Sequence, residues 1–199
     1  MPDDHYFSAA PSATSRPQEL ELTLPDVHLT LVADRGVFSA RAVDPGTVEF
    51  LKAVPPPPPE GHLLDLGCGY GPIACTLALR APRATVWALD VNERALSLTA
   101  SNAKRNGAPN VRAVTSADIP ADVTFSGIWS NPPIRIGKPA LHALLEGWLA
   151  RLVPGGFAWL VVHHHLGGDS LARWLDAQGW VTSKVSSRKG YRIMKVAAR

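Results

Sequence analysis

The sequence is poor in cysteine and has no long hydrophobic run. Its 199 residues include two cysteines, Cys68 and Cys75, which are too few for a disulfide framework. No apolar stretch approaches the roughly 20 residues that a membrane span requires, and the first eight residues lack the basic start and apolar core of a signal peptide. We therefore expect a cytoplasmic protein without a membrane anchor.

The sequence also lacks the motifs that bind phosphate groups. No glycine-rich loop is followed by Lys-Ser or Lys-Thr, and Pro72 stands where a dinucleotide fingerprint needs its third glycine. The turn Asp65-Leu66-Gly67-Cys68-Gly69-Tyr70-Gly71 instead carries an acid two positions before its first glycine. A carboxylate there favours a cationic ligand and repels a phosphate. S-adenosylmethionine has a sulfonium and an ammonium but no phosphate. It therefore fits both the absence of a phosphate-binding motif and the presence of the acid.

What the sequence does contain is a regular alternation of strands and helices. We predict strands at 20–24, 27–32, 63–66, 85–89, 111–114, 127–129, 157–162, 180–185 and 191–196, and helices at 46–54, 72–80, 93–106, 141–152 and 170–178. Such alternation is typical of an α/β fold, a mostly parallel sheet with helices on both faces. We expect residues 1–54 to form an N-terminal, β-containing extension that packs on a domain formed by residues 55–199, with the five prolines at 55–59 as connector.

Ligands of such sheets bind at the carboxyl ends of the strands, where two further acids follow strands. Asp90 ends the second strand of the domain, 19 residues beyond Gly71, where a carboxylate can accept both ribose hydroxyls of a nucleoside. Asp118 follows the third strand and can accept an adenine amino group, although an ordinary loop aspartate fits its spacing equally well.

The fourth strand of the domain ends in Asn131-Pro132-Pro133-Ile134. Two prolines fix the backbone, and we expect them to leave their carbonyls without competing local donors. The Asn131 amide oxygen and the Pro132 carbonyl can then accept both hydrogens of an exocyclic amine. Methyl transfer from a sulfonium needs orientation more than acid–base chemistry. The tetrapeptide therefore predicts methylation of an amino nitrogen.

Together these residues resemble the class I S-adenosylmethionine-dependent methyltransferases, and more narrowly the MTS-domain family of small-subunit ribosomal RNA guanine-N2 methyltransferases. The narrower resemblance rests on His5-Tyr6-Phe7-Ser8, Gly36-Val37-Phe38-Ser39, Asp44-Pro45-Gly46 and Lys189-Gly190-Tyr191-Arg192. It implies a Rossmann-like methyltransferase fold with a mostly parallel seven-stranded sheet, S-adenosylmethionine as cofactor, and ribosomal RNA or the small ribosomal subunit as partner.

The resemblance also implies roles for the matching positions. The cofactor-binding residues would be Phe38, Asp65, Gly67, Cys68, Gly69, Gly71, Asp90, Val91, Asn92, Asp118 and Asn131. Catalysis would rest on Asn131, Pro132, Pro133 and Ile134, with no metal ion. Asp65 and the glycines would surround the methionine moiety, Asp90 the ribose and Asp118 the adenine.

The chain departs from the family pattern in two ways, and these keep other substrates open. It lacks the degenerate second copy of the domain that precedes the active one in many relatives. Ile134 stands where many amino-methyltransferases have an aromatic residue, whose stacking on a base gains on the order of 1 kcal/mol or more. The alternatives are adenine N6, another DNA base, protein glutamine, a small molecule, or a non-catalytic ribosome-assembly module. The oligomeric state is open.

Three features have a structural and a functional interpretation. The net charge is +3, and the basic residues near the C-terminus form either a solvated tail or a rim that faces nucleic acid. The side chains of His163-His164-His165 alternate between the faces of a strand, so they cannot chelate one metal ion together. A structural role is favoured for these histidines, with one of them lining a substrate pocket as the alternative. We expect most of the six tryptophans to be core residues.

Overall fold

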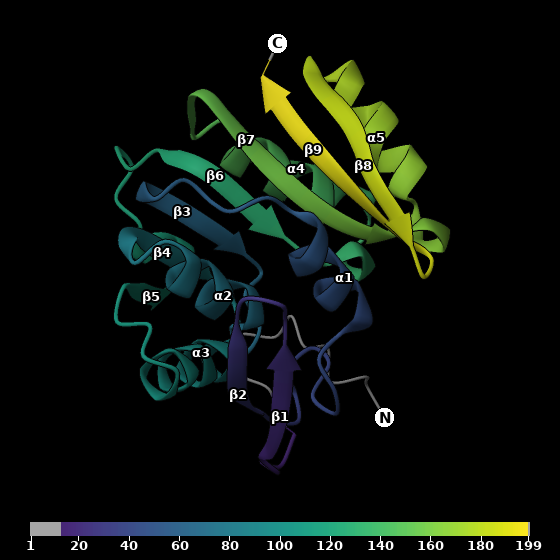
Figure 1. Ribbon diagram of the computed structural model, residues 1–199. Coiled ribbons are helices and arrows are strands. Elements are labelled where there is room, and N and C mark those ends of the chain that lie inside the picture. Colours follow the sequence, from purple (N-terminus) through teal and green to yellow (C-terminus); the bar gives the residue numbers. More distant parts are fainter. Residues whose placement is uncertain (1–12, 199) are drawn as a thin grey trace.

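A sheet of seven strands forms the centre of the part of the chain that the computed structural model describes, residues 13–198 (Figure 1). The strands run in the order β5 (Val111–Val114), β4 (Arg83–Leu89), β3 (Glu60–Leu66), β6 (Phe125–Ser130), β7 (Leu152–His163), β9 (Tyr191–Ala198) and β8 (Trp180–Arg188). Neighbours from β5 to β7 are parallel, and β9 is antiparallel to both β7 and β8. The predicted mostly parallel, seven-stranded sheet is confirmed.

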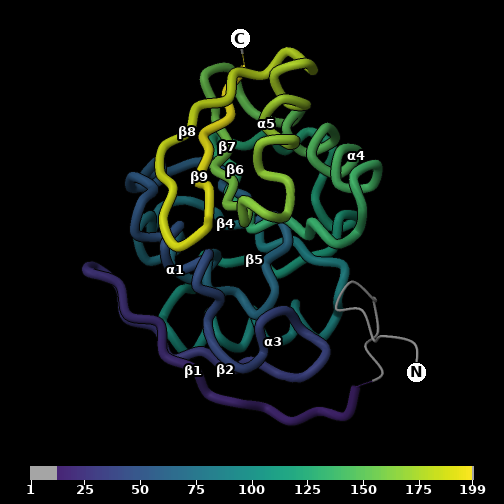
Figure 2. Tube along the Cα trace, turned by 90° about the vertical axis from the view of Figure 1, so that its right-hand side faces the viewer, coloured from purple at the N-terminus to yellow at the C-terminus, as the bar shows by residue number. Residues whose placement is uncertain are grey.

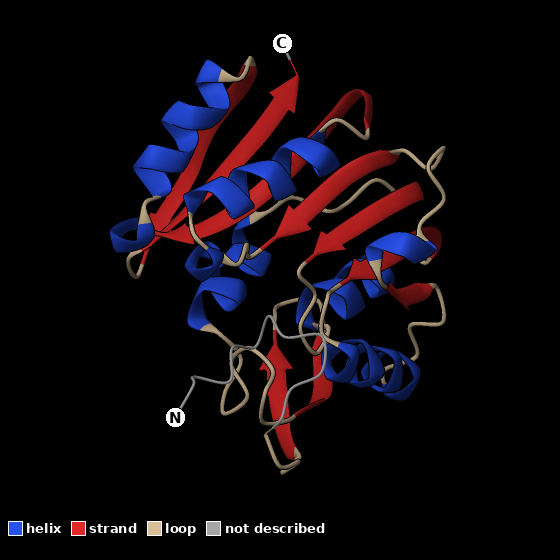
Figure 3. Cartoon of the chain, turned by 180° about the vertical axis from the view of Figure 1, so that it is seen from behind, coloured by secondary structure: helices blue, strands red, loops and turns tan. Residues whose placement is uncertain are grey.

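Two layers of helices cover the two faces of this sheet (Figures 1 and 3). The helices are α1 (Pro45–Ala53), α2 (Pro72–Arg80), α3 (Glu93–Arg105), α4 (Lys138–Leu149) and α5 (Gly168–Ala177). Alternate side chains of β7 pack against the two helix layers, because successive side chains of a strand point to opposite faces of the sheet. Trp159 and Val161 belong to the buried cluster that includes α1, α2 and α3, whereas Leu160 and Val162 belong to the cluster with α4 and α5.

The N-terminal extension contributes a separate two-stranded antiparallel sheet. Its strands, β1 (Gln18–Thr23) and β2 (His28–Ala33), agree with the two strands expected there. Figures 1 and 2 place this hairpin beside α3, at the end of the molecule opposite α5. The motif His5-Tyr6-Phe7-Ser8 lies outside the described residues.

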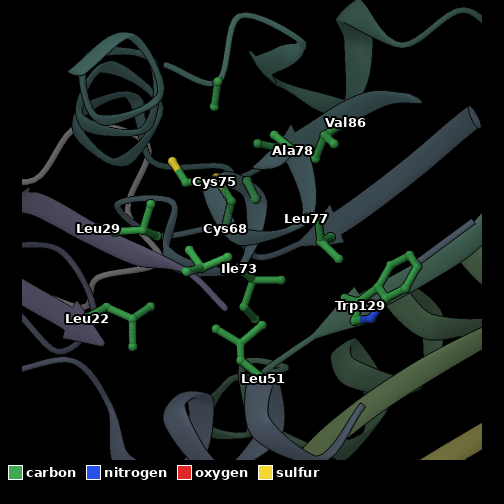
Figure 4. Close-up of a cluster of buried hydrophobic side chains, with 14 of the residues drawn as sticks. Leu22, Leu29, Leu51, Cys68, Ile73, Cys75, Leu77, Ala78, Val86 and Trp129 are labelled. Atoms are coloured by element: carbon green, nitrogen blue, oxygen red, sulfur yellow. The ribbon is translucent and has the colours of Figure 1, made fainter. Parts of the chain in front are cut away.

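Apolar packing and side-chain hydrogen bonds join the hairpin to the helices beside it. Leu22 and Leu29 are buried in the same cluster as Ile73 of α2 (Figure 4). Asn102 of α3 accepts a hydrogen bond from the Val32 backbone N–H at 2.8 Å, and its amide nitrogen donates to the Val32 carbonyl at 2.9 Å. The β2 edge thus satisfies its backbone groups with helix side chains rather than with another strand.

Each predicted helix and strand has a counterpart among the described residues, although several boundaries differ, most of all where α4 ends and β7 begins. The helix expected at 141–152 is α4, which ends at Leu149. The chain then joins the sheet at once, because the Phe125 backbone N–H donates to the Arg151 carbonyl at 2.8 Å. The Pro-Gly-Gly segment at 154–156, expected to close the helix, lies within β7 beside a register irregularity. A proline inside a strand is found at such bulges.

Two exclusions made from composition can be checked in the fold. Cys68 and Cys75 are both buried and free, so they form no disulfide with each other. No helix within residues 13–198 has the length and apolar character needed to cross a bilayer. Trp87, Trp129 and Trp159 are buried, in agreement with a core role for those tryptophans.

Candidate active site

A cavity of about 680 Å³ opens at the carboxyl ends of β3, β4, β6 and β7. This is the edge of a parallel sheet at which ligands bind. Nine of the residues predicted for the site line the cavity. They are Phe38, Gly67, Gly69, Asp90, Val91, Asn131, Pro132, Pro133 and Ile134. The fold therefore brings together the glycine turn, the acid after β4 and the tetrapeptide after β6.

The turn between β3 and α2 presents bare backbone to the cavity. Gly67, Gly69 and Gly71 have φ values of +81°, +57° and +90°, in the left-handed region that favours glycine. The Gly69 backbone N–H donates to Asp90 Oδ2 at 2.9 Å, and the Asn92 N–H donates to Asp90 Oδ1 at 3.0 Å. The Asp90 carboxylate thus ties the turn to the start of α3. Burial raises its pKa.

Asp65 is fully buried beside the first turn of α2 and does not itself line the cavity. Its Oδ2 accepts from the Ala74 backbone N–H at 2.9 Å, while Oδ1 has no hydrogen-bond partner among residues 13–198. Burial raises the pKa of Asp65 to about 8, and the nearby Asp90 charge adds to the rise. A cationic ligand close to these two acids would stabilise their charged forms.

The acid after β4, the bare backbone of the turn and the buried acid behind it fit S-adenosylmethionine. Asp90 places a carboxylate at the cavity wall, and a carboxylate can accept hydrogen bonds from ribose hydroxyls. Gly67 and Gly69 leave space there, since a Cβ atom at Gly67 would point to Pro133 at 3.9 Å and one at Gly69 would meet nothing within 4 Å. The Asp90 carboxylate would repel a phosphate group at this wall.

Four other predicted cofactor residues do not line this cavity, and their roles stay predictions. Asp118 is exposed and accepts from the Thr115 hydroxyl at 2.6 Å. Asn92 caps α3, and its amide donates to the Gly36 carbonyl at 2.8 Å. Cys68 lines a small neighbouring cavity of about 30 Å³. Gly71 is the N-cap of α2.

The carboxamide of Asn131 is held by the N-terminal end of α1. Its Nδ2 donates to Asp44 Oδ2 at 3.0 Å and to Thr47 Oγ1 at 3.1 Å. Both amide hydrogens are therefore directed toward α1. The carboxamide oxygen is the atom that Asn131 can offer to a ligand in the cavity.

The expectation that the two proline carbonyls have no local donors was wrong. The Ile134 backbone N–H donates to the Pro132 carbonyl at 2.8 Å, and the Ile136 N–H donates to the Pro133 carbonyl at 3.1 Å. The first bond closes a three-residue turn at Pro133, which has φ −74° and ψ 72°, and the second belongs to the short 3-10 helix at Ile134–Ile136 that follows. A carbonyl oxygen has two lone pairs, so Pro132 can still accept a second hydrogen bond.

The structure adds Tyr191 to the site, a residue that the sequence analysis did not assign to it. Tyr191 of β9 and His163, the last residue of β7, line the cavity, and their rings meet edge to face with centroids 5.0 Å apart. Ser116, Arg135 and Trp148 also line it. Tyr191 belongs to the recognised motif Lys189-Gly190-Tyr191-Arg192. That motif did not predict that Tyr191 would line the cavity.

The segments that surround Asn131 are linked to one another. The exposed Lys189 ammonium lies 2.8 Å from the buried carboxylate of Glu49 on α1. Gly190 lies against the histidines after β7, since a Cβ atom there would come within 2.9 Å of His163 Nε2. Of the three histidines, His163 lines the cavity, which was the alternative considered for one of them. Among residues 13–198, no group of three or more His, Cys, Asp or Glu side chains is placed to hold a metal ion.

Comparisons with known proteins agree with this geometry. The family model described as the methyltransferase small domain matches residues 28–195. YbxB, an uncharacterized protein of Bacillus subtilis, is 37% identical over 195 residues, which are 96% of this chain and 97% of that protein. A ribosomal RNA small subunit methyltransferase C of Aeromonas hydrophila is 37% identical over 128 residues, which are 63% of this chain and 36% of that enzyme.

The 16S rRNA N2 G1207 methyltransferase of T. thermophilus, solved with AdoMet and guanosine, matches with a TM-score of 0.81 and 23% identity. The match covers 95% of this chain and 52% of that chain. It confirms the Rossmann-like methyltransferase fold. This chain spans 36% and 52% of the lengths of the two ribosomal RNA methyltransferases.

Proposed function

We propose, because this chain belongs to the methyltransferase small domain family, that it transfers a methyl group from S-adenosylmethionine to an exocyclic amino nitrogen. We propose guanine N2 of small-subunit ribosomal RNA as the acceptor. The cofactor is supported by the family and by the AdoMet-bound relative. The acceptor is supported by the substrates of the two ribosomal RNA methyltransferases that the chain resembles.

The orientation of the Asn131 carboxamide is the observation that carries the proposal. With its nitrogen bound to Asp44 and Thr47, the side chain offers an acceptor oxygen to the cavity. An exocyclic amine has two N–H donors, and the Pro132 carbonyl is a second acceptor on the same segment. A hydroxyl or thiol substrate has a single hydrogen to donate and would leave one of these acceptors unused.

S-adenosylmethionine supplies a methyl group that its sulfonium has already activated. The Asp90 carboxylate and the bare backbone of Gly67 and Gly69, which line the cavity, would hold this cofactor. Asn131 and Pro132 accept the two amine hydrogens, which turns the nitrogen lone pair toward the methyl group. The nitrogen becomes positive as the new N–C bond forms and the S–C bond breaks. The two oxygen dipoles stabilise that charge, and the amine proton then leaves to water.

The remaining wall of the cavity suits a flat base on a charged backbone. Ile134, Leu144 and Trp148 give it apolar surface, and Arg135 stands at the same wall. Phe38 is 39% exposed and lines the cavity from the N-terminal side. An extruded base can pack on apolar side chains while its phosphates meet a cation.

The test is methyl incorporation into small ribosomal subunits purified from a strain that lacks this gene. We expect the protein and labelled cofactor to produce N2-methylguanosine, identified by mass spectrometry after digestion of the RNA. We expect Asn131→Ala to abolish the incorporation. Label found only in protein or in small metabolites would rule out the RNA substrate, and N6-methyladenosine in its place would rule out guanine.

A further inference from the structure

The carboxylate of Asp44 lies between the first turn of α1 and the carboxamide of Asn131. Its Oδ2 accepts from the Thr47 backbone N–H at 2.8 Å and from Asn131 Nδ2 at 3.0 Å. We propose that Asp44 is a positioning residue for methyl transfer, which fixes the Asn131 carboxamide with its oxygen toward the substrate amine. This inference rests on the proposed function.

A carboxamide has two orientations, which exchange its oxygen and its nitrogen. The Thr47 hydroxyl, 3.1 Å from Asn131 Nδ2, does not choose between them because a hydroxyl can donate or accept. The Asp44 carboxylate can only accept, so it selects the orientation with the nitrogen toward α1. In the reverse orientation an oxygen would face the carboxylate, and two N–H groups would face an amine that also donates.

The Asp44 carboxylate is itself held in place from the C-terminal side. Tyr191 lies near Asp44, and burial together with the Asp44 charge raises the pKa of Tyr191. The Tyr191 ring lies so close to Gly46 that a Cβ atom there would be 2.4 Å from a ring carbon. Lys189, in the turn between β8 and β9, forms an ion pair with Glu49 of α1. Motifs from the N-terminal and C-terminal parts of the described chain therefore both contribute to the surroundings that fix the orientation of the Asn131 carboxamide.

Asp44 is also the N-cap of α1, so its positioning role must be separated from its role in the helix. Serine caps helices about as well as aspartate. A serine hydroxyl is one bond closer to the backbone, so Asp44→Ser keeps the cap and loses the contact with Asn131. Asp44→Asn keeps both a cap and an acceptor oxygen but removes the charge.

The first experiment compares these two variants with the wild-type full-length chain. We expect Asp44→Ser to lower kcat about 10- to 100-fold, as expected when a reacting group is misplaced, with an unchanged melting temperature and cofactor Kd. We expect Asp44→Asn to lose less of kcat than Asp44→Ser. A wild-type kcat in Asp44→Ser overturns the inference, and so does a loss confined to melting temperature or cofactor Kd.

The second experiment exchanges the two polar groups. Asn131→Asp places two carboxylates against each other, and we expect it to lower kcat strongly. Adding Asp44→Asn restores a donor and an acceptor across the contact, so the double variant should recover kcat at least about 10-fold over Asn131→Asp alone. If Asp44 acts independently of Asn131, the two losses multiply instead, and the inference fails.

These outcomes can be told apart from failure of the proposed function. If Asn131→Ala retains full methyl transfer, the proposed function fails. If Asn131→Ala is inactive and the double variant is no better than Asn131→Asp, the function stands and the role of Asp44 is rejected.

Discussion

The cavity has two sides that are built in different ways. We call the turn between β3 and α2, with Asp65 and Asp90, the cofactor side. We call Asp44, Asn131 and Tyr191 the amine side. The hydrogen bonds that the Asp65 and Asp90 carboxylates accept on the cofactor side join residues at most 21 positions apart, such as Gly69 and Asp90. The contact of Asn131 with Asp44 on the amine side joins residues 87 positions apart.

This difference has a structural cause. The cofactor side sits on two adjacent parallel strands and the turns that follow them, so its geometry comes with the sheet itself. The amine side needs the N-terminal extension to place α1 and the antiparallel hairpin of β8 and β9 to place Tyr191. We therefore expect changes on the two sides to affect different measurements: cofactor affinity on one side, and turnover or substrate KM on the other.

The largest expected effect is on the amine side. Asn131→Ala removes an oriented acceptor from the reacting nitrogen, and we expect kcat to fall about 100- to 1000-fold, as for other preorganised dipoles. The cofactor Kd, measured by calorimetry, should not change. A Kd that weakens in parallel with kcat would show that the two sides are not separate in function.

The next largest effect is on the cofactor side. Asp90→Ala removes a carboxylate that lines the cavity and binds the Gly69 and Asn92 backbones. Loss of hydrogen bonds to a charged group costs about 1.5–3 kcal/mol, so we expect the cofactor Kd to rise roughly 10- to 100-fold. At saturating cofactor, kcat should recover toward the wild-type value. A kcat that stays low at saturation contradicts the division between the sides.

The same difference explains what could be predicted from the sequence. Gly67, Gly69 and Asp90 were predicted because each stands at a fixed place in a strand–turn–helix unit that is local in the sequence. The contact of Asn131 with Asp44 was not predicted, although both residues lay in recognised motifs. No local pattern states which strand follows β6 in the sheet, or that α1 returns to the end of that strand.

Two errors had a more local origin. The Pro132 carbonyl was expected to lack a local donor, because the three-residue turn at Pro133 has no distinct signal in the sequence. The end of α4 was placed too late because Ala150 and Arg151 continue a helical pattern. Tertiary pairing decided the boundary, since the Arg151 carbonyl accepts from Phe125 of β6.

A smaller effect tests how α1 is held. Glu49→Gln removes the charge that pairs with Lys189, and such a pair with an exposed lysine contributes about 1 kcal/mol or less. If α1 and the hairpin of β8 and β9 together shape the amine side, we expect the KM for the RNA substrate to rise by up to roughly fivefold. The cofactor Kd should not change.

Glu19→Gln is the matched control for this change. Glu19 also lies in the N-terminal extension and also pairs with a cation of the main domain, Arg105. Both members of this pair, however, are exposed. This pair joins the hairpin of β1 and β2 to α3, and neither residue lines the cavity. The KM should therefore stay at the wild-type value. An equal rise of KM in both variants would mean that general loosening of the extension, rather than the position of α1, sets the substrate KM.

The pH dependence of stability should contain contributions of opposite sign from Glu49 and Asp65. Lys189 holds the pKa of Glu49 below its usual value, so the stability that Glu49 contributes is present above its unfolded pKa and is lost as the pH falls through its folded pKa. Asp65 behaves in the opposite way. Its folded pKa of about 8 lies above its ordinary value of 3.8, so between these values the unfolded chain binds fewer protons than the folded chain.

Stability should therefore decrease as the pH rises from about 4 to 8, by at most roughly 1.4 kcal/mol per pH unit from this group. Asp65→Asn removes the titration and keeps the shape of the side chain. We expect urea midpoints measured from pH 5 to pH 8 to fall less steeply in this variant than in the wild type, while Glu49→Gln keeps the wild-type slope in that range. Equal slopes in Asp65→Asn and the wild type would mean that Asp65 is already ionised in the folded protein, and that the cofactor side carries a buried negative charge before any cation binds.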